Sequence, residues 1–229
     1  MKSLPETICR NRQYFFGYLV FLLAFMLFCI ATGKGAGFLL INSFHNPLLD
    51  YFFILLTNVG NGLFVIAIIA WMVIRKKYYW AWQTGISFLF TGLLVQILKH
   101  LIYSPRPKTF FEHRAFIHTI QGITRTGASS FPSGHTTSVF ALCTLLSLFF
   151  SDKRWSLFFL MIACLTGFSR IYLSQHFPID VLAGSLIGVL GSLFIYTVLP
   201  DRLFRKDSPG ELSAQPVKAR PGDASGPSV

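Results

Sequence analysis

Long apolar runs dominate the sequence and restrict what the chain can fold into. The run from Tyr14 to Ile30 contains no charged residue, and several others reach the roughly 18 to 20 residues that a helix needs to cross about 30 Å of hydrocarbon. Of the 229 residues, 53% are hydrophobic and only 13% are charged, a balance that soluble domains do not show. We therefore predict an all-α integral membrane protein.

Six apolar segments are expected to form membrane-spanning helices. They lie at about 15–33, 52–74, 81–103, 136–151, 156–174 and 180–199. The first is longer than the roughly 7 to 15 apolar residues of a signal peptide, which favours a retained anchor. The prediction is one membrane-embedded domain over residues 1–206, a six-helix bundle with a long loop between its third and fourth helices.

Basic residues between the apolar segments indicate the orientation. Four clusters fall on one side of a six-span bundle: Lys2, Arg10 and Arg12; Arg75, Lys76 and Lys77; Lys153 and Arg154; and Arg202, Arg205 and Lys206. The positive-inside rule places this side, with both termini, in the cytoplasm. The segments 34–51, 104–135 and 175–179 then face the opposite side, and 34–51 is expected to lie at the membrane interface.

The remaining composition excludes several other classes. The formal net charge of +11 does not indicate nucleic acid binding, because the basic residues form no single stripe. The four cysteines have no metal-ligand spacing and are expected to be small buried hydrophobes. Residues 207–229, rich in Pro, Gly, Ser and Ala, are predicted to form a disordered cytoplasmic tail because they cannot bury enough apolar surface to fold.

Polar clusters gather in the segments that face away from the cytoplasm. In the first, Pro105 and Pro107 end the third span and let Lys99 and Arg106 reach the membrane surface. In the second, Pro132-Ser133-Gly134-His135 leads into the fourth span. The N–H groups of that first helical turn and the helix dipole form an anion site, which a glycine lets an anion approach closely.

The third cluster, SRIYLSQHFPID at 169–180, connects the fifth span to the sixth. Pro178 suits the first turn of a helix, which places Asp180 just inside it and His176 in the turn before it, close enough for a carboxylate–imidazole hydrogen bond. Arg170 lies further back in the fifth span. Ionisable groups at this depth in a membrane indicate function.

Each cluster taken alone has a simpler explanation. Lys99 and Arg106 could snorkel at the interface, the sequence PSGH could be a turn with a serine cap, and His176 with Asp180 could be a structural pair. A topology derived from other residues nevertheless brings all three clusters to one membrane face. Their combination therefore favours a functional site.

Together the clusters resemble the three-part signature of the type 2 phosphatidic acid phosphatase (lipid phosphate phosphatase) superfamily. The matching motifs are Lys99-x6-Arg106-Pro107, Pro132-Ser133-Gly134-His135 and Ser169-Arg170-x5-His176-x3-Asp180. The resemblance covers about residues 50–200, with every signature position present. It implies six membrane helices and a site at the outer surface. Since the short chain looks like bacterial members, it also implies an inner-membrane protein with a periplasmic active site.

The resemblance implies a role for each signature residue. His176 would attack phosphorus and form a phosphohistidine, Asp180 would orient His176, and His135 would protonate the leaving oxygen. The phosphate-binding residues would be Lys99, Arg106, Ser133, Gly134 and Arg170. The two histidines and the aspartate have the chemistry of metal ligands, but the three cations around them would repel a bound metal, so we expect neither a metal nor another cofactor.

The function that the resemblance implies is hydrolysis of the terminal phosphate of a lipid phosphate or diphosphate. A transferase that moves the phosphoryl or headgroup to another acceptor is an alternative, and so is a non-enzymatic anion transporter. The motif fits several lipids, with a preference for a polyprenyl diphosphate or phosphatidylglycerol phosphate, and indicates no oligomeric state. Charged loop residues either select the headgroup or are simply solvated: Glu112, His113, Arg114, His118 and Arg125.

Overall fold

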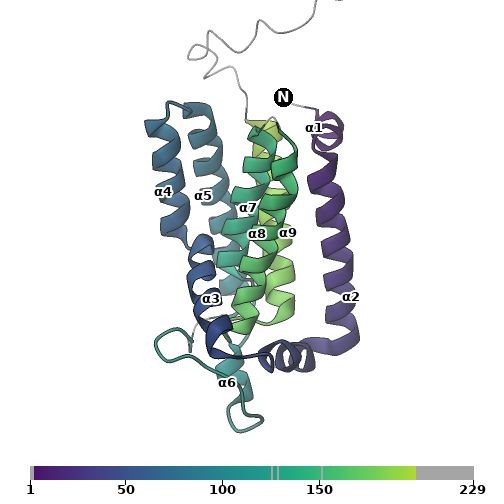
Figure 1. Ribbon diagram of the computed structural model, residues 1–229, viewed down its shortest axis with the longest axis vertical. Helices are drawn as coiled ribbons and strands as arrows, with labels where there is room; N and C mark the ends of the chain where they lie inside the picture. Colours follow the sequence, from purple (N-terminus) through teal and green to yellow (C-terminus); the bar gives the residue numbers. More distant parts are fainter. Residues whose placement is uncertain (1–2, 125, 128, 151, 200–229) are drawn as a thin grey trace, which may run out of the picture.

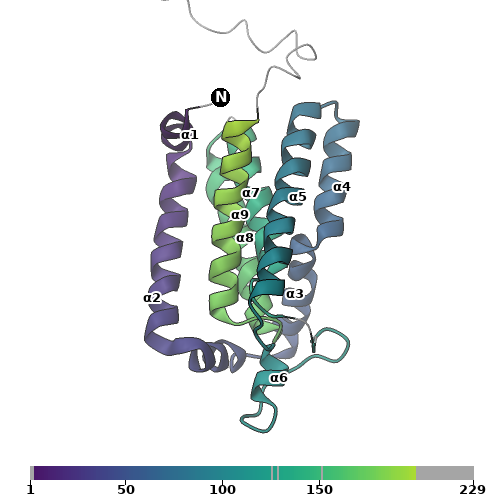
Figure 2. The same cartoon turned by 180° about the vertical axis from the view of Figure 1, so that it is seen from behind.

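The protein is a bundle of upright helices, closed at one end by short helices and loops (Figures 1 and 2). The computed structural model describes residues 3–124, 126–127, 129–150 and 152–199. The helices are α1 (Leu4–Arg10), α2 (Arg12–Asn42), α3 (Pro47–Thr57), the 3₁₀ turn η1 (Asn58–Gly60), α4 (Gly62–Ile74), α5 (Tyr78–Leu101), α6 (Pro107–Phe111), α7 (Gly134–Phe149), α8 (Arg154–Tyr172) and α9 (Pro178–Val198). The described residues contain no strand, which confirms the all-α class.

The number of membrane spans is less clear-cut than the sequence predicts. Among the described residues, α2, α5, α8 and α9 are long and apolar enough to cross a membrane, and α3 with α4 forms a fifth candidate that is bent by 55°. The predicted span 136–151 coincides with α7, which has only 16 residues. The described structure thus supports four or five spans, and six stays a prediction.

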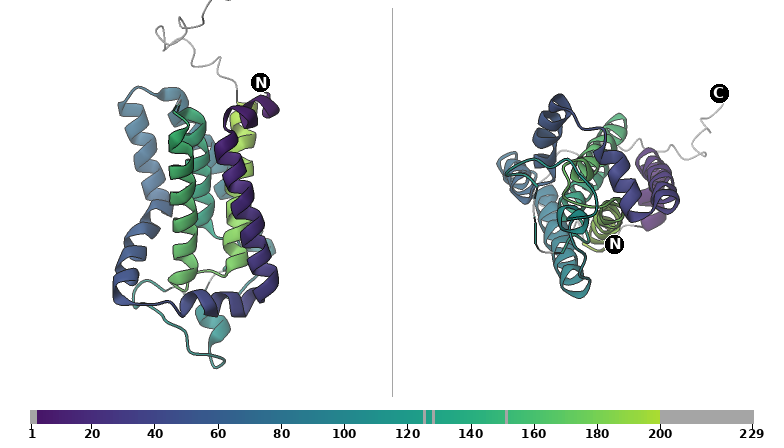
Figure 3. Two further views of the ribbon diagram at one scale, coloured as in Figure 1. Left: turned by 45° about the vertical axis from the view of Figure 1, so that its right-hand side comes forward. Right: turned by 90° about the horizontal axis from the view of Figure 1, so that it is seen from below.

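Helix α2 changes direction at Gly33, where φ is 70° and ψ is 179°. Glycine adopts such positive φ values without steric cost because it has no Cβ. The part before Gly33 runs along the bundle, whereas residues 34–42 lie across its end (Figures 1 and 3). The predicted end of the first span at residue 33 therefore matches the bend, and the segment expected at the interface begins as a helix.

Helices α7, α8 and α9 form the centre of the bundle (Figure 3). Two glycines of α9 allow a close approach to α7, as small residues do between membrane helices. A Cβ on Gly184 would lie 2.7 Å from the carbonyl oxygen of Ser133, and one on Gly188 would lie 2.6 Å from that of Thr137. This contact holds the first residues of α7 beside the first residues of α9.

The two ends of the bundle differ in charge and in structure. Helix α1, the α4–α5 turn and the α7–α8 turn lie at one end, and α6 with the loop between α5 and α7 lies at the other (Figure 1). The basic clusters at Arg10, at 75–77 and at 153–154 therefore share one end, as the prediction requires. Lys2, the cluster after α9 and the predicted tail 207–229 lie outside the described residues.

Candidate active site

The three polar clusters predicted from the sequence meet at the end of the bundle opposite the basic turns. Lys99 lies in the last turn of α5, and His135 is the second residue of α7. His176 lies in the turn between α8 and α9, and Asp180 is the third residue of α9. The order of the helices thus gathers residues that are up to 81 positions apart in the sequence (180 − 99).

His176 and Asp180 form a buried pair. Their exposed fractions are 2% and 0%, and His176 Nδ1 lies 3.6 Å from Asp180 Oδ2. The same Oδ2 accepts a hydrogen bond of 2.9 Å from the backbone N–H of Phe177, because Pro178 starts the helix and places Asp180 where a carboxylate caps the first turn. The structure brings the two predicted residues together, but their distance exceeds that of the direct hydrogen bond expected from the sequence.

The basic residues of the signature hold the backbone around this pair. Arg106 Nη1 donates to the carbonyl oxygen of Gln175 over 2.9 Å, directly beside His176 in the chain. The carbonyl oxygen of Arg170 accepts hydrogen bonds of 3.0 and 3.1 Å from the N–H groups of Gln175 and His176. Lys99 interacts electrostatically with Arg106, Arg170 and Asp180. The charges of Arg106 and Arg170 also act on His176, so the three cations lie near the His176–Asp180 pair.

Burial lowers the pKa of His176 to about 4, although the neighbouring negative charge of Asp180 acts in the opposite direction. The charges of Arg170 and Arg106 lower the pKa further. At neutral pH the ring is therefore uncharged, and one of its nitrogens carries a lone pair. An uncharged imidazole inside a ring of cations is suited to nucleophilic attack on an anion.

The N-terminus of α7 is tied to α9. Ser133 is the N-cap of α7, its hydroxyl accepts a hydrogen bond of 2.8 Å from the Thr136 hydroxyl, and its N–H donates to the carbonyl oxygen of Asp180 over 3.0 Å. His135 is half-buried and packs against Gly60 of η1, where a Cβ would come within 2.8 Å of the His135 carbonyl oxygen. Gly134 begins the helix, so the predicted anion site lies beside the His176–Asp180 pair.

Three buried serines lie next to the His176–Asp180 pair. The sequence motifs did not indicate them. We call Ser104, Ser129 and Ser130 the serine layer. Ser130 Oγ lies 3.3 Å from His176 Nδ1 and donates a hydrogen bond to Asp180 Oδ2. A signal was present in the sequence, since the Ser129-Ser130 pair comes just before Pro132, but serines also favour loops for local reasons.

Cationic side chains anchor the serine layer from two helices. Lys99 Nζ donates to the carbonyl oxygen of Ser129 over 2.9 Å. Lys34 Nζ, from the part of α2 beyond the bend, donates to Ser104 Oγ over 3.0 Å and lies 4.4 Å from the centre of the Phe177 ring. The bent helix thereby reaches the residue that follows His176, a contact that the sequence did not predict.

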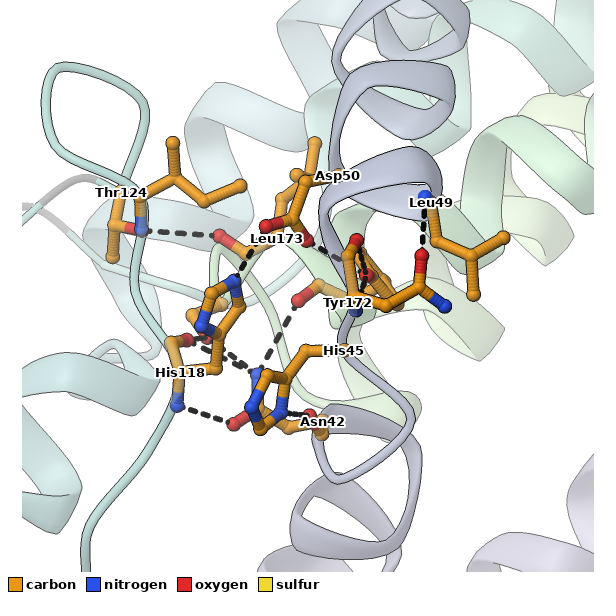
Figure 4. A network of polar contacts seen from close by, with 11 residues as sticks. Asn42, His45, Leu49, Asp50, His118, Thr124, Tyr172 and Leu173 are labelled. Atoms are coloured by element: carbon orange, nitrogen blue, oxygen red, sulfur yellow. Dashed lines mark hydrogen bonds and ion pairs between the residues drawn. The ribbon is translucent and has the colours of Figure 1, made fainter.

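A second polar network ties the outer loop to the histidine turn (Figure 4). Asn42 Nδ2 donates to Ser174 Oγ over 3.0 Å, and the N–H of His118 donates to Asn42 Oδ1 over 2.8 Å. His118 Nε2 lies 2.9 Å from Asp50 Oδ2, and the Tyr172 hydroxyl donates to Asp50 Oδ1 over 2.7 Å. The network joins α2, α3 and α8 to the loop between α5 and α7. It also includes Ser174, two residues before His176.

The other loop residues predicted to select a headgroup or to be solvated lie further out. Glu112 and His113 line an open cavity of about 290 Å³ together with Lys108. The Arg114 guanidinium lies 4.8 Å from the centre of the Phe110 ring. Arg125 lies outside the described residues. His118 Nε2 pairs with Asp50, so this side of the ring is not free to contact a headgroup.

Two curated relatives resemble the chain over most of its length. Undecaprenyl-diphosphatase BcrC of Bacillus subtilis (strain 168) is 33% identical over 159 residues, which cover 66% of this chain and 76% of that protein. Lipid A 4'-phosphatase of Porphyromonas gingivalis is 28% identical over 167 residues, which cover 70% of each. One name describes a diphosphatase and the other a phosphatase of lipid A.

Two solved structures share the architecture. The crystal structure of Aquifex aeolicus LpxE superposes with a TM-score of 0.62 at 30% identity, covering 69% of this chain and 92% of that one. A transmembrane PAP2 type phosphatidylglycerolphosphate phosphatase from Bacillus subtilis, at 24% identity, shares the fold with a TM-score of 0.58 over 77% of this chain and 93% of its own. The model of the PAP2 superfamily matches residues 80–204, which include all three motifs. The chain therefore belongs to the PAP2 superfamily.

Proposed function

We propose that the protein is a membrane phosphatase that removes the terminal phosphate of a lipid phosphate or diphosphate through a phosphohistidine on His176. The observation that carries the proposal is the buried, uncharged His176, which is paired with Asp180 and surrounded by the cations Lys99, Arg106 and Arg170. A terminal phosphate carries about −1.5 to −2 charges near pH 7, and the positive charges of these three residues complement it.

The reaction follows from these positions. Nε2 of His176 attacks phosphorus, and a P–N bond forms while the bond to the lipid oxygen breaks. His135 gives its proton to the leaving oxygen, so the lipid departs with a hydroxyl group, or with its remaining phosphate if the substrate is a diphosphate. His135 then takes a proton from water, the water attacks phosphorus, and the P–N bond breaks to release inorganic phosphate. Lys99, Arg106 and Arg170, with Ser133 and the Gly134 N–H, neutralise the phosphoryl oxygens throughout.

We infer that the substrate is a bacterial envelope lipid, and we rank a polyprenyl diphosphate first among the candidate substrates. The relatives named as an undecaprenyl-diphosphatase and as a lipid A 4'-phosphatase support this class of substrate. The basic turns at one end of the bundle support a six-span arrangement with both termini in the cytoplasm and the site at the periplasmic face. The reaction needs no metal or other cofactor, because the surrounding cations supply the positive charge.

Phosphate release by the purified protein tests the proposal. The substrates are undecaprenyl diphosphate, phosphatidylglycerol phosphate, phosphatidic acid and phosphorylated lipid A, each presented in mixed micelles. We expect release of inorganic phosphate, fastest from the diphosphate, and a loss of at least about 10³-fold in His176→Ala and of about 10²-fold or more in His135→Ala. His100→Ala, which changes an exposed histidine of α5, is the matched control and retains the wild-type rate.

The same assay separates the alternatives. Products formed with and without added alcohol or lipid acceptors distinguish hydrolysis from transfer, since a transferase needs the acceptor for turnover. A transporter would release no phosphate from any of the four lipids. Either that result or a wild-type rate in His176→Ala would contradict the proposal.

A further inference from the structure

The contact between His176 and Asp180 is not a direct hydrogen bond. Nδ1 and Oδ2 are 3.6 Å apart, whereas N–H···O hydrogen bonds in proteins measure about 2.7 to 3.2 Å. Ser130 Oγ lies within reach of both groups, at 3.3 Å from Nδ1 and in hydrogen-bonding contact with Oδ2. The hydroxyl therefore bridges the imidazole and the carboxylate.

The number of protons on a hydroxyl decides which group donates in each of the two hydrogen bonds of Ser130. A serine has one O–H to donate and lone pairs that accept. Its proton goes to the ionised carboxylate of Asp180, so its oxygen accepts from His176, which requires the proton of the neutral ring to be on Nδ1. Nε2 then carries the lone pair, on the side of the ring that faces away from Asp180.

We propose that Ser130 is a positioning residue for the nucleophile: its hydroxyl accepts the Nδ1–H of His176, donates to Asp180 and so holds the tautomer and ring orientation in which Nε2 attacks phosphorus. The inference rests on the proposed function, because it takes His176 as the nucleophile. During attack the ring gains positive charge as the P–N bond forms, and Asp180 stabilises this charge through the serine without removing a proton.

The surroundings of Ser130 fix its side chain in place. The residue is 0% exposed, so bulk water cannot replace its hydroxyl. Its N–H donates to the carbonyl oxygen of Ser104 over 2.7 Å, and Ser104 is held in turn by Lys34. Ser130 lies before the Pro132-Ser133-Gly134-His135 motif, so none of the roles assigned to that motif includes it.

Single-turnover formation of the phosphohistidine tests this role. In Ser130→Ala we expect the rate to fall about 10- to 100-fold, the effect of losing a hydrogen bond to a charged partner, with the half-saturating substrate concentration unchanged. Ser130→Gly, which removes the whole side chain, is expected to show the same loss of rate. Ser147→Ala is the matched control: it removes a buried hydroxyl at the other end of α7, where the bond is to Ser156, and it keeps the wild-type rate.

A double-mutant cycle distinguishes positioning from a general structural role. Because Ser130 acts through Asp180, adding Ser130→Ala to Asp180→Asn costs less than twofold beyond Asp180→Asn alone. Two losses that multiply would overturn the inference, and so would a wild-type rate in both Ser130 variants. If the wild type releases no phosphate, the proposed function itself fails; if the wild type is active and only the Ser130 results differ from expectation, the function stands and the inference alone is wrong.

Discussion

His176 combines almost complete burial with an uncharged ring, and this combination decides how the residue responds to pH. The solvation that an imidazolium needs is missing at a side chain that is 2% exposed. The adjacent Asp180 only partly compensates, and the cations Arg106 and Arg170 oppose protonation. The surroundings thus keep the proposed nucleophile in its uncharged form.

We predict that His176 remains neutral well below the usual titration range of histidine. Its pKa is lowered to about 4, so the neutral form persists from pH 7 downwards and is lost only as the pH falls through about 4. The ¹³Cε1 chemical shift of His176 in the purified protein, assigned by its disappearance in His176→Ala, should therefore show a midpoint near pH 4. A midpoint between pH 6 and pH 7 would contradict the burial that the structure shows.

Catalysis should also survive removal of divalent metals. Lys99, Arg106 and Arg170 lie around the proposed phosphate site and would repel a second source of positive charge. Phosphate release in millimolar EDTA is expected to stay within about twofold of the untreated rate, while a magnesium-dependent phosphatase in the same assay loses its activity. Inactivation by EDTA that added Mg²⁺ or Zn²⁺ reverses would show that this prediction is wrong.

At the scale of single residues, the sequence predicted contacts between residues that are close in the chain, but not contacts between residues that are far apart in it. His176 and Asp180 are four positions apart around a proline that starts a helix, so their proximity follows from local geometry. The Ser130–His176 contact joins residues 46 positions apart, and the Asn42–His118 contact joins residues 76 positions apart. Such contacts depend on the course of the loop between α5 and α7, which no periodic pattern encodes.

Among the helices, the contact between α7 and α9 has the most direct effect on the site. It relies on Gly184 and Gly188, and it places the Ser133 N–H against the carbonyl oxygen of Asp180. The bend between α3 and α4 has a related role, because it brings Gly60 against His135. The sequence predicted a continuous span at 52–74, but the helix breaks at residues 58–62, where the Asn61 side chain caps α4 by accepting a hydrogen bond from the Leu63 N–H.

Substituting Gly184 should separate these two helices. In Gly184→Ala the new methyl group meets the Ser133 carbonyl oxygen, a rigid backbone atom, so overpacking is expected to cost about 1 to 3 kcal/mol and to weaken phosphate release. The control is Gly92→Ala in α5, where a Cβ has no neighbour within 4 Å; it should be neutral or stabilising by up to about 1 kcal/mol. Thermal unfolding in detergent measures both, and equal midpoints for the two variants would contradict the proposed packing.

For the whole molecule, the separation of the basic turns from the site predicts how the bundle lies in the membrane. Cys9, which was expected from the sequence to be buried, is exposed on α1 at the end with the basic turns, and Phe116 is 91% exposed in the loop at the opposite end. A membrane-impermeant maleimide added to intact spheroplasts should label Phe116→Cys in a Cys9→Ser background. Cys9 of the wild type should be labelled only after the cells are opened, and the reverse pattern would show that the orientation is inverted.

The shortness of α7 sets the depth at which the protein works. Its 16 residues extend about 24 Å at 1.5 Å per residue, some 6 Å less than the roughly 30 Å of a hydrocarbon layer. With its last turn at the lipid boundary of the basic end, as the proposed orientation has it, its first turn would stop short of the opposite boundary, below the level of the lipid headgroups. The proposed reaction would then take place without lifting the lipid toward water, and every methylene that stays in the hydrocarbon layer avoids a transfer cost of about 0.8 kcal/mol.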